Sequence, residues 1–130
     1  MFRWVEHTAE LELEIEAPSK EGVFGEALAA FAELAGDRDG GSTVRELTLE
    51  ADDPPMLLVA WLDELVYLGE TEGFVPERVT ALELDDGSLR ATVEGHAGEP
   101  RHLVKAVTLH RLELRPDDGG GWRARVVLDV

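Results

Sequence analysis

The sequence predicts a single α+β domain of two layers, with two helices packed on one face of a largely antiparallel sheet of about six strands. The chain has 130 residues, the length of one compact domain, so we take residues 1–130 as one unit. Two segments show the apolar spacing of helices. A segment with a period of two precedes the first, and a strand-like segment with imperfect alternation lies between them. The remainder of the chain consists of strand-like segments, which favours an α+β fold over a doubly wound sheet.

The N-terminal part predicts a strand followed by a helix. Leucine or isoleucine alternates with glutamate over residues 11–16, which predicts a half-buried strand with an acidic, solvated outer face. Ser19 can cap a helix in which apolar residues recur at three- and four-residue spacing until Gly36. Residues 37–41, rich in aspartate and glycine, predict a loop.

The remaining elements are a second strand, a second helix and four further strands. Residues 43–51 predict the strand. Asp53 and Pro54 predict the helix start, because the carboxylate can cap the helix and proline at its first position sacrifices no hydrogen bond. This leucine-rich helix should end within residues 69–73. The four strands are expected at residues 78–85, 89–96, 105–115 and 122–129.

Composition excludes several classes of protein. The chain has 28 acidic and 12 basic residues and a formal net charge of −16, which disfavours stable nucleic-acid binding because phosphate contacts need lysine or arginine. It has no cysteine, so a metal site must use oxygen or imidazole ligands. We recognise no signal peptide or membrane span, and therefore expect a cytoplasmic protein that does not associate with membranes.

The last predicted strand gathers negative charge at its end. Its apolar face continues to Val130, so we expect the chain end to be held in the sheet beside Asp129. Two clustered anions repel each other unless a cation neutralises them. Oxygen ligands select hard cations such as Ca²⁺ or Mg²⁺.

Two further residues are candidates for function. His7 opens the polar tetrapeptide HTAE just before the first predicted strand, although a lone histidine commonly serves a local structural role. Lys105 is one of only two lysines and lies in an apolar run, where its stem could equally snorkel at a strand start.

Five segments resemble a known family in their order and spacing. They are HTAE at residues 7–10, WLDELVYL at 61–68, EGF at 72–74, VKAVTLH at 104–110 and LDV at 128–130. Together they are similar to the archease family, and the resemblance covers essentially the whole chain. It implies an activator of the tRNA-splicing RNA ligase that joins 2′,3′-cyclic-phosphate and 5′-hydroxyl RNA ends. Such a protein promotes guanylylation of the ligase histidine and multiple turnover without being an enzyme itself.

The resemblance also implies a metal site. The family's metal-binding aspartate falls on Glu10, its penultimate aspartate on Asp129 and its terminal residue on Val130. We expect Ca²⁺ there, with Mg²⁺ or Mn²⁺ as alternatives, and we expect the three residues to be gathered inward. The family's functional lysine matches Lys105, and we assign His7 with it to activation of the ligase.

The acidic composition predicts how a partner would bind, and the same candidate residues allow two other functions. The acidic surface should dock transiently on the basic RNA-binding face of the ligase, and salt should weaken this contact. A metal-dependent hydrolase would use Glu10 as a base beside His7 and Lys105. In a chaperone-like or scaffold protein the carboxylates would be surface charge only.

Overall fold

The computed structural model describes residues 1–36, 40–99 and 104–130, and these residues form two helices and seven strands. In chain order the elements are β1 (Phe2–His7), β2 (Glu10–Ala17), α1 (Lys20–Ala35), β3 (Ser42–Glu50), α2 (Pro54–Glu72), β4 (Phe74–Leu84), β5 (Ser88–Ala97), β6 (Ala106–Pro116) and β7 (Trp122–Asp129). The predicted α+β class is confirmed. The loop expected at 37–41 lies partly outside the described residues.

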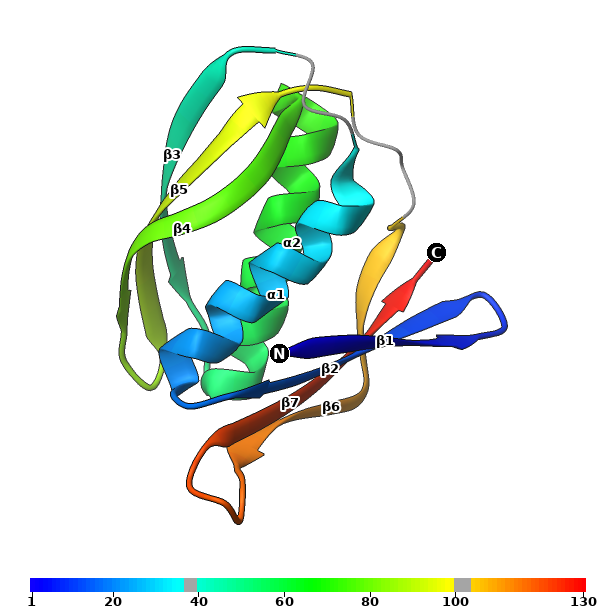
Figure 1. Cartoon of the computed structure of the whole chain (residues 1–130), viewed down its shortest axis with the longest axis vertical. Helices are drawn as coiled ribbons and strands as arrows, with labels where there is room; N and C mark the ends of the chain where they lie inside the picture. The colour runs from blue at the N-terminus through cyan, green and yellow to red at the C-terminus, as the bar shows by residue number, and fades with distance from the viewer. Residues whose placement is uncertain (37–39, 100–103) are drawn as a thin grey trace.

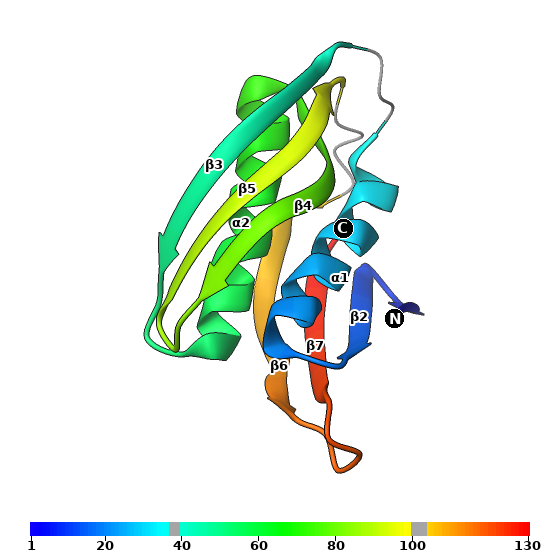
Figure 2. The ribbon, with the colours of Figure 1, turned by 60° about the vertical axis from the view of Figure 1, so that its left-hand side comes forward.

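The strands form two antiparallel sheets. The four-stranded sheet has the order β1-β2-β7-β6, and the three-stranded sheet has the order β3-β5-β4. Both helices contact both sheets: α1 packs against β2 and β4, and α2 packs against β6 and β4 (Figure 1). Turned by 60°, the molecule shows the three-stranded sheet in front of α2 (Figure 2).

This arrangement corrects the expectation of about six strands in one sheet. The strand at Phe2–His7 was missed because its sequence, FRWVEH, does not alternate strictly between apolar and polar residues. The period of apolar residues along a segment identifies a strand, but it does not show which other strand pairs with it. Two sheets are possible here because the helices bury apolar residues on more than one side, and a second sheet can cover what the first leaves exposed.

The helix ends follow the predicted capping residues. The backbone N–H of Gly22 donates to Ser19 Oγ at 3.0 Å, and the N–H of Met56 donates to Asp53 Oδ1 at 2.9 Å. The second helix ends at Gly73, whose φ of 64° lies in the left-handed region that glycine adopts readily.

The core lies between the sheets and is centred on Trp61. This side chain is fully buried, and its indole Nε1 donates to the carbonyl oxygen of Phe24 at 3.0 Å. The Phe24 and Trp61 rings meet edge to face, with their centroids 6.2 Å apart. The hydrogen bond from Trp61 to Phe24 therefore links α2 to α1 within the core.

Two local features shape one end of the four-stranded sheet. The turn between β1 and β2 contains Ala9 at φ 61°, which is unusual for a residue with a side chain. In β6, the pairing with β7 shifts between Thr108 and Glu113, and Arg111 there adopts φ 56°. The hairpin, the residue before β6 and the end of β7 carry the predicted site residues, and the bulge in β6 lies at the same end of the sheet.

Candidate functional site

The predicted site residues come together at this end of the four-stranded sheet. Glu10 on β2 lies directly opposite Asp129 on β7, and His7 on β1 lies opposite Glu10. Residues opposite each other in an antiparallel pair project from the same face. The N–H of Lys105 donates to the Asp129 carbonyl at 2.7 Å, and the N–H of Val130 donates to the carbonyl of Ala9 at 3.3 Å.

The site faces outward, which corrects the expectation that its acidic groups are gathered inward. Glu10 and Asp129 lie on the sheet face opposite the helices, because Leu11 and Leu128, their neighbours in sequence, point to the core. The Glu10 side chain keeps 38% of its surface exposed, and Asp129 is half-buried. Lys105 is exposed. These groups are therefore accessible to solvent and to a macromolecular partner.

The buried carboxylate of the cluster is Glu12, which sequence analysis assigned to a solvated face. Its side chain is only 6% exposed. Arg111 Nη2 lies 3.0 Å from Glu12 Oε1, His7 Nε2 lies 3.7 Å from the same oxygen, and Arg125 Nε lies 3.8 Å from Glu12 Oε2. Strands β1, β6 and β7 thus each direct a nitrogen-bearing side chain at one carboxylate of β2.

Arg111 links this buried carboxylate to the candidate site. Its Nη2 also lies 3.9 Å from Glu10 Oε2. Neither Glu12 nor Arg111 could be identified from sequence, because alternation shows which face a residue occupies and not what covers that face. The bulge that brings Arg111 over Glu12 has no signature such as glycine in the sequence.

The rest of the outer face is also paired. The Arg3 Nε donates to Glu14 Oε2 at 3.1 Å, and Arg123 Nη2 donates to Glu16 Oε1 at 2.9 Å. The hydrogen bond from Arg3 lowers the pKa of the Glu14 carboxyl. Of the eight arginines in the described part of the chain, five contact carboxylates on this face: Arg3, Arg111, Arg115, Arg123 and Arg125. The face predicted to be acidic and solvated is therefore covered by a network of ion pairs.

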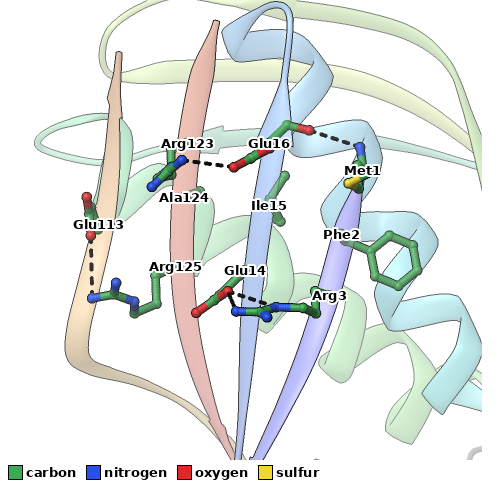
Figure 3. Close-up of a pocket in the computed structure, with 10 residues that line it drawn as sticks. All are labelled: Met1, Phe2, Arg3, Glu14, Ile15, Glu16, Glu113, Arg123, Ala124 and Arg125. Carbon is green, nitrogen blue, oxygen red and sulfur yellow. Dashed lines mark hydrogen bonds and ion pairs between the residues drawn. The ribbon is translucent and has the colours of Figure 1, made fainter. Parts of the chain in front are cut away.

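A cavity of about 290 Å³ lies over this network, at the end of the sheet away from Glu10 and Asp129 (Figure 3). Its charged lining consists of Arg3, Arg123 and Arg125 with Glu14, Glu16 and Glu113. Figure 3 shows the charged side chains side by side across β1, β2, β7 and β6, with Arg3 beside Glu14, Arg123 beside Glu16 and Arg125 beside Glu113, so the opposite charges of the lining neutralise each other. None of the sequence-predicted site residues lines this cavity.

The donor set at Glu10 and Asp129 suits a hard cation. Both side chains offer carboxylate oxygens from facing positions, and Val130 adds a backbone oxygen next to Asp129. Among the described residues, no group of three or more histidine, aspartate or glutamate side chains is arranged to hold a metal ion. A cation bound here would therefore complete its coordination with water or with a partner's oxygen atoms.

Comparisons with known proteins agree on one family. The family model described as "Archease protein family (MTH1598/TM1083)" matches residues 2–130. The chain is 34% identical over 140 residues to "Protein archease" of Methanosarcina mazei, covering 99% of this chain and 95% of that protein. It is 35% identical over 136 residues to "Probable protein archease" of Mycobacterium tuberculosis, covering 98% of this chain and 74% of that protein.

Two solved structures share the fold. The solution structure of protein 1598 from Methanobacterium thermoautotrophicum has a TM-score of 0.71 and 30% identity, covering 99% of this chain and 98% of that one. The crystal structure of a Thermotoga maritima protein described as an archease and possible chaperone has a TM-score of 0.68 and 24% identity, covering 100% of this chain and 98% of that one. The resemblance found in the sequence is confirmed. Neither helix in the described part of the chain could cross a membrane.

Proposed function

This chain belongs to the archease family, and on that premise we propose that it activates a tRNA-splicing RNA ligase. The ligase would join 2′,3′-cyclic-phosphate and 5′-hydroxyl RNA ends. The chain would promote guanylylation of the ligase histidine and allow multiple turnover, acting on another enzyme in the cytoplasm. The observation that carries this proposal is the family match over residues 2–130, in a chain whose motif residues His7, Glu10, Lys105 and Asp129 meet at one sheet end.

The site would hold a divalent cation through Glu10, Asp129 and Val130, with Ca²⁺ expected first and Mg²⁺ or Mn²⁺ as alternatives. Such an ion supplies positive charge and exchangeable oxygen ligands. The half-exposed carboxylates keep their oxygens available to a partner, and Lys105, whose backbone N–H bonds to the Asp129 carbonyl, offers an exposed side chain. His7 lies opposite Glu10 and brings its Nε2 within 3.7 Å of the buried Glu12.

Docking would depend on the net charge of −16, which attracts a basic partner surface at long range. The carboxylates of β2 contribute little to that attraction, because arginines on the same face neutralise them. Acidic groups outside β2 would supply most of this attraction. Raising the salt concentration to about 0.5 M shortens the Debye length to a few ångströms and should weaken both docking and activation.

The test is ligase guanylylation, measured with and without this chain and its variants. Stimulation by wild type that is lost in Glu10→Ala and in Asp129→Ala supports the proposal. Glu16→Ala is the matched control, because Glu16 lies on the same strand and face but at the far end. Intact stimulation in both site variants would refute the metal site, and no stimulation by wild type would refute the activator function.

A chaperone-like function is the second candidate, favoured by the description of the Thermotoga maritima structure. In that case the chain would suppress aggregation of unrelated unfolded proteins, and the Glu10 and Asp129 variants would do so equally well. Light scattering of a heated client protein measures this activity. An activator of one ligase should have no effect in that assay.

A further inference from the structure

Glu12 is a charged group that the fold has removed from water. With 6% of its side chain exposed, its carboxylate needs counter-charge, and Arg111 at 3.0 Å is the nearest source. His7 and Arg125 lie farther away, at 3.7 and 3.8 Å. The main ionic partner of the buried carboxylate therefore comes from β6.

The bulge in β6 positions Arg111 for this role. Thr108 pairs with Val127 and Glu113 pairs with Arg125, so residues 109–112 of β6 lie opposite Val126 alone. Arg111 adopts φ 56° within this bulge, where glycine or asparagine would be the more usual residue. From this backbone conformation the Arg111 guanidinium reaches Glu12.

The same guanidinium also reaches the candidate cation site. Its Nη2 lies 3.9 Å from Glu10 Oε2, while 41% of the Arg111 side chain remains exposed. A positive charge at this distance neutralises the Glu10 carboxylate and would repel a cation held between Glu10 and Asp129.

We propose that Arg111 is the resident counter-cation of Glu10 and that a divalent cation must displace it to bind at Glu10 and Asp129. This inference rests on the proposed function for the site itself. The added claim is that Arg111 weakens cation binding. Its guanidinium stays paired with Glu12, while its contact with Glu10 is replaced by the cation. Removing its charge should tighten Ca²⁺ binding about five- to tenfold, as expected for loss of a half-exposed ion pair and its field.

The test is calorimetric titration of the full chain with Ca²⁺ and, separately, with Mn²⁺. Arg111→Gln should bind about five- to tenfold more tightly than wild type. Arg111→Lys retains the charge and should bind within about twofold of wild type. Arg123→Gln is the matched control, because it removes the same charge from the same sheet face, where Arg123 pairs with Glu16. Its affinity should equal that of wild type.

The double variant Arg111→Gln with Glu12→Gln separates two explanations of tighter binding. If Arg111 acts through Glu10, the double variant retains the gain. If the freed Glu12 has become a ligand, the gain disappears and the inference is wrong. The double variant also leaves no unpaired buried carboxylate, so it provides the test if Arg111→Gln does not fold.

Equal affinity of wild type and Arg111→Gln, or equal tightening by Arg123→Gln, would overturn the inference. Absence of cation binding in every variant would overturn it together with the proposed metal site. The guanylylation assay is independent of these titrations. If the chain fails to stimulate the ligase while Arg111→Gln binds cation more tightly, the activator function is refuted and the role of Arg111 stands.

Discussion

Removing Arg111 should destabilise the protein more than removing the charge of its partner. Arg111→Ala leaves Glu12 ionised at 6% exposure, with its next nitrogens at 3.7 and 3.8 Å. Breaking a buried pair in this way costs about 3–5 kcal/mol, and the two remaining partners reduce the expected cost to about 2–3 kcal/mol. Glu12→Gln leaves Arg111 with 41% of its side chain in water, so we expect a loss of only about 1 kcal/mol.

Urea denaturation followed by circular dichroism measures both losses in the free energy of unfolding. For a domain of this length, 2–3 kcal/mol corresponds to a fall in Tm of roughly 6–12 °C. The double variant Arg111→Ala with Glu12→Gln should lose less than the sum of the two single changes, because it leaves no buried carboxylate without its arginine. A cost below about 0.5 kcal/mol for Arg111→Ala, or a larger cost for Glu12→Gln, would refute the assignment of Glu12 as a buried charge held by Arg111.

Three further changes test other parts of the fold. Ala9→Gly should raise the free energy of unfolding by about 0.5–1 kcal/mol, because Ala9 holds φ 61°; a loss measured by urea denaturation would contradict this. Trp61→Phe should lower Tm through a loss of about 1–3 kcal/mol, because the Phe24 carbonyl loses the indole donor in the core. Glu14→Gln should be less stable than wild type near neutral pH. The lowered pKa of Glu14 makes its contribution full above the carboxyl's unfolded-state pKa and lost as pH falls through the folded one, so denaturation curves of the two proteins should converge in acid.

The elements that local chemistry determines could be predicted from the sequence. The alternation over residues 11–16 shows which side chains face the helices, and Ser19 and Asp53 cap the helices through contacts with residues three positions later. The strand at Phe2–His7 gives a weaker signal, because the apolar Val5 directly follows Trp4 and breaks the period of two. The division into two sheets depends on long-range pairing, which local pattern does not encode.

The candidate site was predictable in its membership but not in its electrostatics. His7, Glu10, Lys105 and Asp129 could be selected by motif, and their meeting depends on the register of β1, β2, β7 and the start of β6. The burial of Glu12 depends instead on strands that approach it from far along the chain. For the same reason, the arginines that neutralise β2 are visible only once the strand order is known.

The count of RNA joined per ligase molecule tests the central claim most directly. A cognate ligase would be incubated with excess RNA carrying 2′,3′-cyclic-phosphate and 5′-hydroxyl ends, with GTP and divalent cation, and with or without this chain. An activator predicts many products per ligase when the wild-type chain is present, and about one or fewer when it is absent or replaced by Asp129→Ala. The same number of products with and without the wild-type chain would contradict the account.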